Sequence, residues 1–447
     1  MKTEASQQCI NPACALKYPS NEIRIRCEKG HLLDVKYRGR FPKYLKDVFY
    51  KRRNHGGNIY NESGVWRFRE LINFLEIDTE NQAQCSKFLV SLDGAEGRLS
   101  RPYKMTKVAD FVRLKPDGLF LQPEGYNPSG SFKDNGMSTA LTHAKMLGVK
   151  RIICASTGNT SASAAMYASN ENIECDVFIP KGEVAPGKLG QAFQFGAQVV
   201  EIEGNFDDAL FASIEEAKKT NAYIVNSINP FRLEGQKTIL YRIMEYLKWE
   251  PPDWIVYPGG ALGNTSSAGK CLMELYEWRW IKKVPRLAVI NSEGANTFYN
   301  LYNGKYNDVR LRWNKGKVDE ELINHYYQYM DKNQIRPKTE ATAIQIGKPT
   351  NILKALRALE FTKGLVTQVS DIEMYDGMSI VGLNGFDCEL ASGSVPAGIK
   401  KLVKEEAIKK DDVVVGILTG RQKDPNVSVK YHLDPRNRYA KPAIGYN

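Results

Sequence analysis

The sequence lacks long apolar runs, an apolar leader and a dense set of cysteines, and each absence excludes a class of protein. Its longest apolar stretches are short pieces such as residues 413–418, far below the roughly 18 residues of a membrane-spanning helix. The first residues, MKTEASQQ, match neither a signal peptide nor a transit peptide. Eight cysteines among 447 residues are too few for a disulfide scaffold. We therefore expect a cytoplasmic protein of enzyme size.

Charge of one sign is not concentrated along the chain. Lysine and arginine (62) outnumber aspartate and glutamate (51), which gives a net charge of +11 and raises the question of nucleic-acid binding. Apart from residues 50–53 and the surroundings of Arg279, however, the basic residues are interleaved with acidic ones. A mildly basic, solvated surface explains this pattern better, so we expect no nucleic-acid partner and no membrane. Such a surface attracts small anionic ligands.

Short apolar runs alternate with amphipathic stretches from residue 151 to residue 293, as expected for parallel strands joined by crossover helices. Strands are predicted at residues 151–155, 175–179, 198–202, 223–226, 254–257, 286–290 and 412–418. Helices are predicted at residues 207–219 and 238–249, where apolar residues recur every three or four positions. The pattern predicts a doubly wound α/β fold that binds its ligand at the carboxyl ends of the strands.

A glycine-rich turn, PGGALGN, follows the strand predicted at residues 254–257 and leads into a helix expected to begin near residues 264–267. It is not a P-loop, because Gly263 and Gly269 are one residue too far apart and Cys271 stands where Ser or Thr is needed. It does not have the GxGxxG spacing either. The turn is either a socket for an anion at a helix N-terminus or a tight turn that needs glycine for positive φ.

Two further turns carry groups that suit catalysis. Residues 156–163 place five hydroxyls and an amide at the start of a small-residue helix, more than one helix cap requires, which favours a polar or anionic ligand. Lys133 begins a helix after a Pro/Gly/Ser turn, where the helix dipole would lower its pKa, although a lysine in such a place is more often simply solvated. A nucleophilic lysine, a hydroxyl-rich loop and a phosphate socket are together the parts that pyridoxal phosphate chemistry needs.

Five segments closely resemble, in the same order, those of the threonine synthases, pyridoxal phosphate enzymes of fold type II related to the tryptophan synthase β chain. The segments are NPSGSFKDNGM, ASTGNTSASAAMYA, NSINPFRLEGQKT, PGGALGN and ILTGRQKDP. With GVWRFREL and ATAIQIGKP the resemblance extends from residue 64 to residue 424. It implies two α/β domains with the cofactor in the cleft between them, and a homodimer. We expect a large domain at 46–140 and 230–447, a small domain at 141–229 and an N-terminal ribbon-like segment at 1–45.

The resemblance also implies the roles of individual residues. Lys133 would form the Schiff base with pyridoxal phosphate and carry protons during the reaction. Asn159 would contact the 3′-oxygen of the cofactor, and Thr419 would face its pyridine nitrogen. The phosphate of the cofactor would be held by the turn formed by Gly260, Ala261, Leu262, Gly263 and Asn264. The phosphate of the substrate would be held by Ser156, Thr160, Ser227 and Arg232.

The implied reaction converts O-phospho-L-homoserine and water to L-threonine and phosphate. Two departures from the family concern the substrate: Ala261 stands where relatives often have Asn, and residues 95–102, expected as a strand, read AEGRLSRP without the usual Thr. A cysteate synthase acting on O-phosphoserine and a serine or threonine dehydratase are alternatives, although a dehydratase has no substrate phosphate for Arg232 to hold. A non-catalytic nucleic-acid-binding protein is a third alternative.

The N-terminal segment contains the pattern C-x4-C-x12-C-x3-H, formed by Cys9, Cys14, Cys27 and His31. This spacing lies within the range of zinc modules, and the prolines at 12 and 19 with a strand-like stretch at 22–26 favour a small ribbon over a finger helix. The alternative is a metal-free ribbon folded against the large domain. We favour that alternative from the sequence and predict no metal site.

Overall fold

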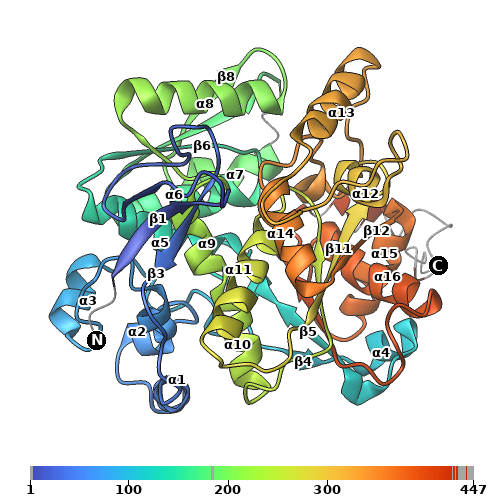
Figure 1. Cartoon of the computed structure of the whole chain (residues 1–447), viewed down its shortest axis with the longest axis horizontal. Helices are drawn as coiled ribbons and strands as arrows, with labels where there is room; N and C mark the ends of the chain where they lie inside the picture. Colours follow the sequence, from blue (N-terminus) through green and yellow to red (C-terminus); the bar gives the residue numbers. More distant parts are fainter. Residues whose placement is uncertain (1–3, 183–185, 425, 428, 431–438, 440–447) are drawn as a thin grey trace, which may run out of the picture.

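The computed structural model describes residues 4–182, 186–424, 426, 427, 429, 430 and 439, which form three sheets surrounded by helices (Figure 1). The strands are β1 (Ala5–Cys9), β2 (Lys17–Pro19), β3 (Leu33–Tyr37), β4 (Tyr103–Lys104), β5 (Leu119–Pro123), β6 (Arg151–Ala155), β7 (Glu174–Pro180), β8 (Gln198–Ile202), β9 (Tyr223–Ile224), β10 (Trp254–Pro258), β11 (Arg286–Ser292), β12 (Leu365–Val369) and β13 (Val414–Leu418).

The helices are α1 (Leu45–His55), α2 (Ile59–Glu62), α3 (Gln82–Phe88), α4 (Thr106–Val112), α5 (Lys133–Met146), α6 (Asn159–Asn170), α7 (Pro186–Gln194), α8 (Phe206–Thr220), α9 (Pro230–Gln236), α10 (Thr238–Tyr246), α11 (Gly263–Glu277), α12 (Thr297–Asn303), α13 (Glu320–Lys332), α14 (Ile352–Thr362), α15 (Asp371–Gly382) and α16 (Leu390–Lys404). Short 3-10 turns occur at Trp66–Ile72, Pro116–Gly118, Glu124–Tyr126 and Thr342–Ile344. Among the residues described, every helix is too short or too polar to span a membrane.

The two larger sheets divide the chain in an interrupted order. The six-stranded sheet has the order β12-β11-β10-β13-β5-β4 and is parallel except for the antiparallel pair of β4 with β5. The four-stranded sheet has the order β8-β7-β6-β9 and is parallel throughout. The chain therefore builds β4 and β5 of one sheet, forms the whole of the other, and returns to complete the first. The domain boundaries that we expect at residues 140/141 and 229/230 stay predictions.

The six-stranded sheet buries both of its faces, which is why its strands read as continuous apolar runs. Along β10, Ile255 and Tyr257 pack with helices α10, α11 and α14. The alternate residues Trp254 and Val256 pack into a second core with α4, α15 and α16. The strand period of two thus assigns successive side chains to opposite layers, and the doubly wound α/β fold predicted from the sequence is confirmed.

The four-stranded sheet is covered in the same way. Along β6, Ile152 and Cys154 face a core built with α5 and α6, whereas Ile153 and Ala155 lie in the apolar core that includes α8. Helix α8 begins with a capping box in which Asn205 and Asp208 exchange hydrogen bonds, so its start is fixed by the sequence.

The seven strands predicted between residues 151 and 418 and both predicted helices are present, most of them with closely similar bounds. The helix predicted at 238–249 ends at Tyr246, because Lys248 and Trp249 have positive φ. The strand expected at residues 95–102 is wrong: the segment turns, Gly97 has φ of +66°, and a Cβ there would lie 2.4 Å from a guanidinium nitrogen of Arg242.

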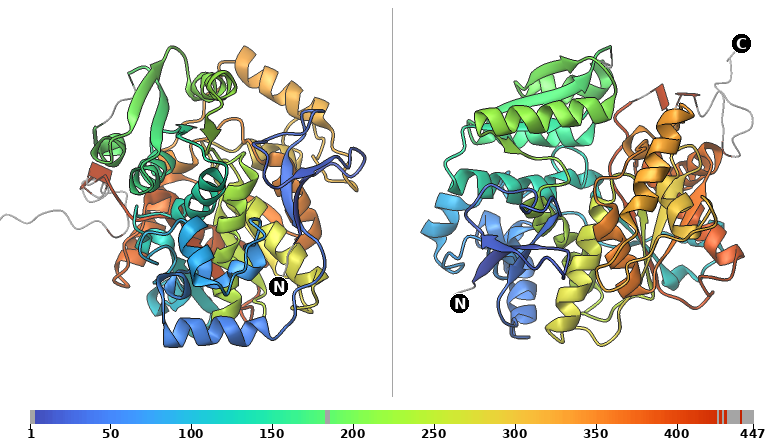
Figure 2. Two further views of the ribbon diagram at one scale, coloured as in Figure 1. Left: turned by 90° about the vertical axis from the view of Figure 1, so that its left-hand side faces the viewer. Right: turned by 45° about the horizontal axis from the view of Figure 1, so that its top comes forward.

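The third sheet, with the order β2-β1-β3, forms an N-terminal ribbon that is bonded to helices α9 and α14 (Figure 2, dark blue). The hydroxyl of Tyr37 donates to Glu234 Oε2 over 2.6 Å, and Lys354 Nζ donates to the carbonyl of Leu33 over 2.6 Å. Residues 22–26, expected to be strand-like, lie outside the three strands. The ribbon is thus anchored through β3.

Candidate active site

The sequence-predicted site residues gather at the carboxyl ends of strands from both larger sheets. Ser156 and Asn159 follow β6, Ser227 follows β9, the glycine-rich turn follows β10, and Thr419 follows β13. Several of these ends are tied together by hydrogen bonds. Asn226 accepts from the amide of Ala155 and donates to its carbonyl, 2.9 Å in each case, which joins the ends of β6 and β9.

Further bonds connect the remaining ends. The amide of Phe132 donates to the carbonyl of Thr419 over 2.9 Å, which fixes the start of α5 against the end of β13. Asn351 donates from its backbone to the carbonyl of Ala261 and from its side chain to the carbonyl of Ser227. The glycine-rich turn and the loop after β9 are therefore held by one residue.

Lys133 is the first residue of α5, and its surroundings favour the neutral amine. Burial lowers its pKa to about 7, and the positive charge of Arg232 acts in the same direction, whereas Glu389 opposes the shift. The side-chain nitrogen of Lys133 lies 4.2 Å from the ring centre of Phe132. The lowered pKa expected from the sequence is confirmed, and its largest cause is desolvation by burial.

Arg232, on α9, is a buried cation whose guanidinium is only partly satisfied. Its side chain has no exposed surface, and Nη1 donates to the carbonyl of Val225 over 2.7 Å. Nε and Nη2 have no hydrogen-bond partner among the described residues, and burial lowers the pKa of the group to about 10. A buried guanidinium with two free donors is suited to an anion that accepts both.

The glycine-rich turn leads directly into α11 and has the features of an anion socket. Helix α11 begins at Gly263 without a side-chain cap, so its first N–H groups are available. The positive φ in this turn, +63°, belongs to Leu262 and not to a glycine. A Cβ on Gly259 would lie 2.6 Å from Asn291, and one on Gly260 3.1 Å from Ile344. Glycine is required here for close packing, so the interpretation as a turn needing glycine for positive φ is wrong.

Glu389 joins two predicted site residues and was not found from the sequence. Its two carboxylate oxygens accept from the side-chain amide of Asn159 (2.8 Å) and from the hydroxyl of Thr419 (2.7 Å). Glu389 is also the residue whose charge raises the pKa of Lys133. It stands at the N-cap position of α16, where glutamate is an unusual choice. No helix was predicted from the sequence at this place, so the sequence offered no signal for Glu389.

Lys423 is a second residue that sequence reasoning missed, although it lies within the segment ILTGRQKDP. Its ammonium donates to Asn159 Oδ1 over 3.0 Å, so both ends of that amide are engaged. Burial lowers the pKa of Lys423. Thr160, in contrast, is half-buried at the start of α6 and makes no side-chain hydrogen bond with the described residues.

Comparison with known proteins finds one family model and several similar chains. The family model described as "Pyridoxal-phosphate dependent enzyme" matches residues 100–420. A threonine synthase of Methanocaldococcus jannaschii is 36% identical over 431 residues, which cover 96% of this chain and 95% of that protein. A threonine synthase of Bacillus sp. is 39% identical over 313 residues, 70% of this chain and 80% of that protein.

Solved structures with low sequence identity share the fold. A processed threonine deaminase isoform 2 from Solanum lycopersicum superposes with a TM-score of 0.58 at 17% identity, covering 74% of this chain and 81% of that one. Maize serine racemase superposes with a TM-score of 0.57 at 17% identity, covering 81% of this chain and 95% of that one.

Proposed function

We propose that this chain, which belongs to the pyridoxal-phosphate dependent enzymes and among them to the threonine synthases, converts O-phospho-L-homoserine and water to L-threonine and phosphate. The observation that carries the choice of a phosphorylated substrate is Arg232, a fully buried cation with two donors unpaired among the described residues. Its charge also lowers the pKa of Lys133. A dehydratase, whose substrate has no phosphate, offers no partner for it.

The residues present fit pyridoxal phosphate, the cofactor of this family. The aldehyde of the cofactor forms a Schiff base only with a neutral amine, and Lys133 supplies one because its pKa is lowered. A phosphate requires backbone donors, which the uncapped start of α11 supplies at residues 260–264. We assign Asn159 and Thr419 to the ring, because both lie against the carboxylate of Glu389, close to Lys133.

Bound pyridoxal phosphate supplies an electron sink that stabilises negative charge on the substrate carbon next to the amino group. Lys133 Nζ can take a proton from that carbon and return one later, because a pKa near 7 makes both directions accessible at neutral pH. Arg232 binds the substrate phosphate and orients the chain of the substrate. Ser156 and Ser227, at adjacent strand ends, contribute hydroxyl donors to the same phosphate, and Thr160 is assigned with them.

The capture of cofactor by the cofactor-free protein should depend on the protonation of Lys133. Only the neutral amine attacks an aldehyde, so we expect the rate to rise with pH and to reach half of its limit near pH 7. Stopped-flow absorbance at a series of pH values measures this midpoint. A midpoint near the ordinary lysine value of about 10.4 would contradict the assignment.

Two charge variants should shift this pH midpoint in opposite directions. Arg232→Gln should move the midpoint to higher pH, since the positive charge of Arg232 lowers the pKa of Lys133. Glu389→Gln should move it to lower pH, since the negative charge of Glu389 raises that pKa. Shifts of equal sign in the two variants would argue against a direct electrostatic effect.

Arg232→Ala should raise the KM for O-phospho-L-homoserine by at least about 30-fold, as expected for a loss of about 2 kcal/mol or more at a buried charged contact. Steady-state phosphate release measures it, and Arg151→Ala is the control, because Arg151 already pairs with Asp176 on the four-stranded sheet. An unchanged KM would exclude the assignment of Arg232 to the phosphate of the substrate.

A second assay tests the cysteate synthase alternative. It measures phosphate release from O-phosphoserine and identifies the product.

We also propose that the enzyme works in the cytoplasm as a homodimer. None of the eight cysteines forms a disulfide, which suits a reducing compartment. The family implies the dimer. The partners are small molecules, and the domain division at residues 141–229 belongs to the same proposal. Light scattering of the purified protein measures the oligomeric state, and a monomeric mass would contradict it.

A further inference from the structure

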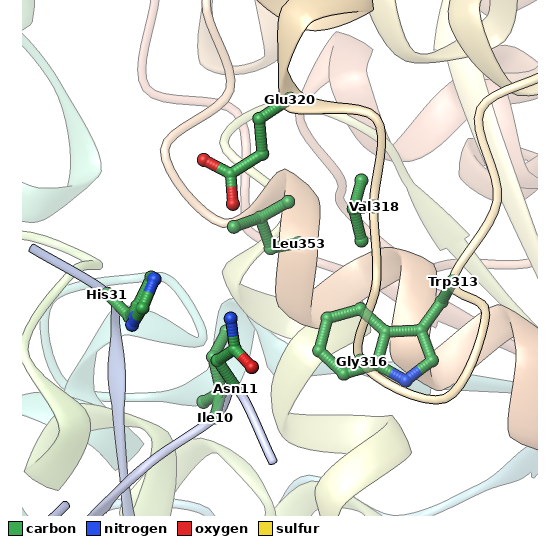
Figure 3. A pocket seen from close by; sticks show the side chains of 8 residues that line it. All are labelled: Ile10, Asn11, His31, Trp313, Gly316, Val318, Glu320 and Leu353. Carbon is green, nitrogen blue, oxygen red and sulfur yellow. The ribbon is translucent and has the colours of Figure 1, made fainter. Parts of the chain in front are cut away.

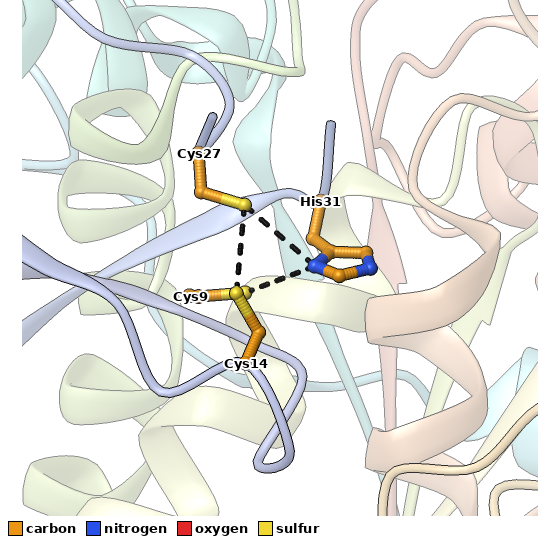
Figure 4. Close-up of side chains that lie close together, drawn as sticks. All are labelled: Cys9, Cys14, Cys27 and His31. Carbon is orange, nitrogen blue, oxygen red and sulfur yellow. Dashed lines mark hydrogen bonds between the residues drawn. The ribbon is translucent and has the colours of Figure 1, made fainter. Parts of the chain in front are cut away.

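The N-terminal ribbon brings together four side chains that the proposed reaction does not use. Cys9, Cys14, Cys27 and His31 each offer one ligand atom, and these atoms all lie within 4.8 Å of one another (Figure 4). Cys9 is the last residue of β1, and His31 comes shortly before β3. The cluster is far along the chain from Lys133 and shares no residue with the active site.

The separations of the ligand atoms match those around a tetrahedral zinc ion. With Zn–S bonds of about 2.3 Å and a Zn–N bond of about 2.0 Å, a tetrahedron places two sulfurs about 3.8 Å apart and sulfur about 3.5 Å from nitrogen. Cys14 Sγ lies 3.9 Å from Cys27 Sγ. His31 Nδ1 lies 3.5 Å from Cys9 Sγ and 3.6 Å from Cys27 Sγ. A disulfide would bring two sulfurs to about 2.05 Å, so the sulfurs are not disulfide-bonded.

The backbone on each side of the cluster is folded into a tight turn that aims two ligands inward. In the first turn, the carbonyl of Asn11 accepts from the amide of Cys14, and the amide of Cys9 donates to the carbonyl of Leu16. In the second, the amide of Cys27 donates to the carbonyl of His31 over 2.9 Å. Backbone hydrogen bonds close both turns, so the convergence of the ligands is part of the fold.

The ribbon is held in two different ways. On one side, Ala5, Ile10, Leu32 and Val35 pack into the main core. Around the four ligands the apolar cluster is small: it consists of Cys9, Tyr18, Cys27 and Leu33, and two of these four are ligands. A local cluster of this size is of the kind that a metal or a disulfide commonly staples. Beyond His31, a small cavity separates the ribbon from the loop before α13, with Asn11 and His31 on one side and Val318 and Glu320 on the other (Figure 3). Packing is therefore incomplete close to the cluster.

We propose that Cys9, Cys14, Cys27 and His31 bind one zinc ion, with His31 coordinating through Nδ1. Three sulfurs and one nitrogen fill all four positions of a tetrahedron, so the site is structural rather than catalytic. The ion fixes the ribbon, whose strand β3 bonds to α9 through Tyr37 and Glu234. The geometry thus revises the metal-free ribbon favoured from the sequence.

Metal analysis of the purified full-length holoenzyme tests the proposal. We expect about one equivalent of zinc per chain in the wild type and in Cys85→Ser, a control that removes a buried cysteine on α3. Cys14→Ser should lose most of the zinc, and Cys14 is chosen because its side chain is only half-buried. Its thermal midpoint should also fall relative to the control.

A second measurement does not depend on a variant folding. Cells grown with cobalt in place of zinc should yield wild-type protein with the intense visible bands of tetrahedral cobalt bound to thiolates. Wild-type protein with less than about a tenth of an equivalent of zinc and no such bands would overturn the proposal. A full equivalent retained by Cys14→Ser would overturn it too, because the metal would then lie elsewhere. These readouts do not involve activity, so the proposed function stands or falls separately.

Discussion

Lys133→Ala should abolish threonine formation, with kcat reduced by about 10³-fold or more, and should yield protein without the visible absorbance of covalently held cofactor. Two losses combine in this variant. The neutral amine that captures the cofactor is removed, and so is the group that moves protons at the substrate carbon. Phosphate release and the absorbance spectrum of the purified protein measure the two effects independently.

Two further variants make the interpretation specific. Lys133→Arg keeps a positive charge but cannot provide a neutral amine, and we expect it to be as inactive as the alanine variant. Lys145→Ala is the control on the same helix. Lys145 lies outside the site and forms an ion pair with Glu171 at 2.7 Å, so this variant should keep both colour and activity. Full absorbance in Lys133→Ala would show that another lysine holds the cofactor.

The second large effect concerns a buried group of four charges between α9 and α11. The group consists of two lysines and two glutamates. Lys270 lies 2.7 Å from Glu234, and Lys237 lies 2.8 Å from Glu274. All four side chains are buried. Burial alone would lower the pKa of Lys270, but Glu234 and Glu274 raise it above its ordinary value.

Lys270→Met should therefore lower the free energy of unfolding by about 3–5 kcal/mol, because it leaves two buried carboxylates with one lysine between them. Urea unfolding of the purified variant measures this loss. The double variant Lys270→Met with Glu274→Met keeps one balanced pair, Lys237 with Glu234, and should recover most of the stability. A double variant no more stable than Lys270→Met would show that the effect arises from packing rather than from an unpaired charge.

The sequence predicts the α/β fold well because parallel strands buried on both faces leave an unambiguous pattern. The runs that became β10 and β13 are apolar at nearly every position, and the helix that became α8 carries its own capping box. Residues 95–102 were mispredicted as a strand, because their conformation follows from packing against Arg242, which is distant in sequence.

The residues of the candidate active site also fall into two groups, those that local sequence indicates and those that depend on tertiary contacts. Lys133 and the glycine-rich turn lie next to strands and helix starts, so local sequence marks them. Glu389 belongs to the site only because α16 begins beside the end of β13, and this contact depends on tertiary structure. Cys9, Cys14, Cys27 and His31 were visible as a spacing, but a spacing does not show that their four ligand atoms meet. Their convergence follows from the two backbone turns of the folded ribbon.

The position of β13 has a consequence for the synthesis of the enzyme. This strand comes last among the described strands, yet it lies in the middle of the six-stranded sheet, between β5 and β10. Until residues 414–418 leave the ribosome, the facing edges of β5 and β10 have no partner, and such edges are prone to pair with other chains. The nascent protein therefore has two unpaired strand edges inside its largest sheet. It should depend on chaperones until β13 inserts between β5 and β10.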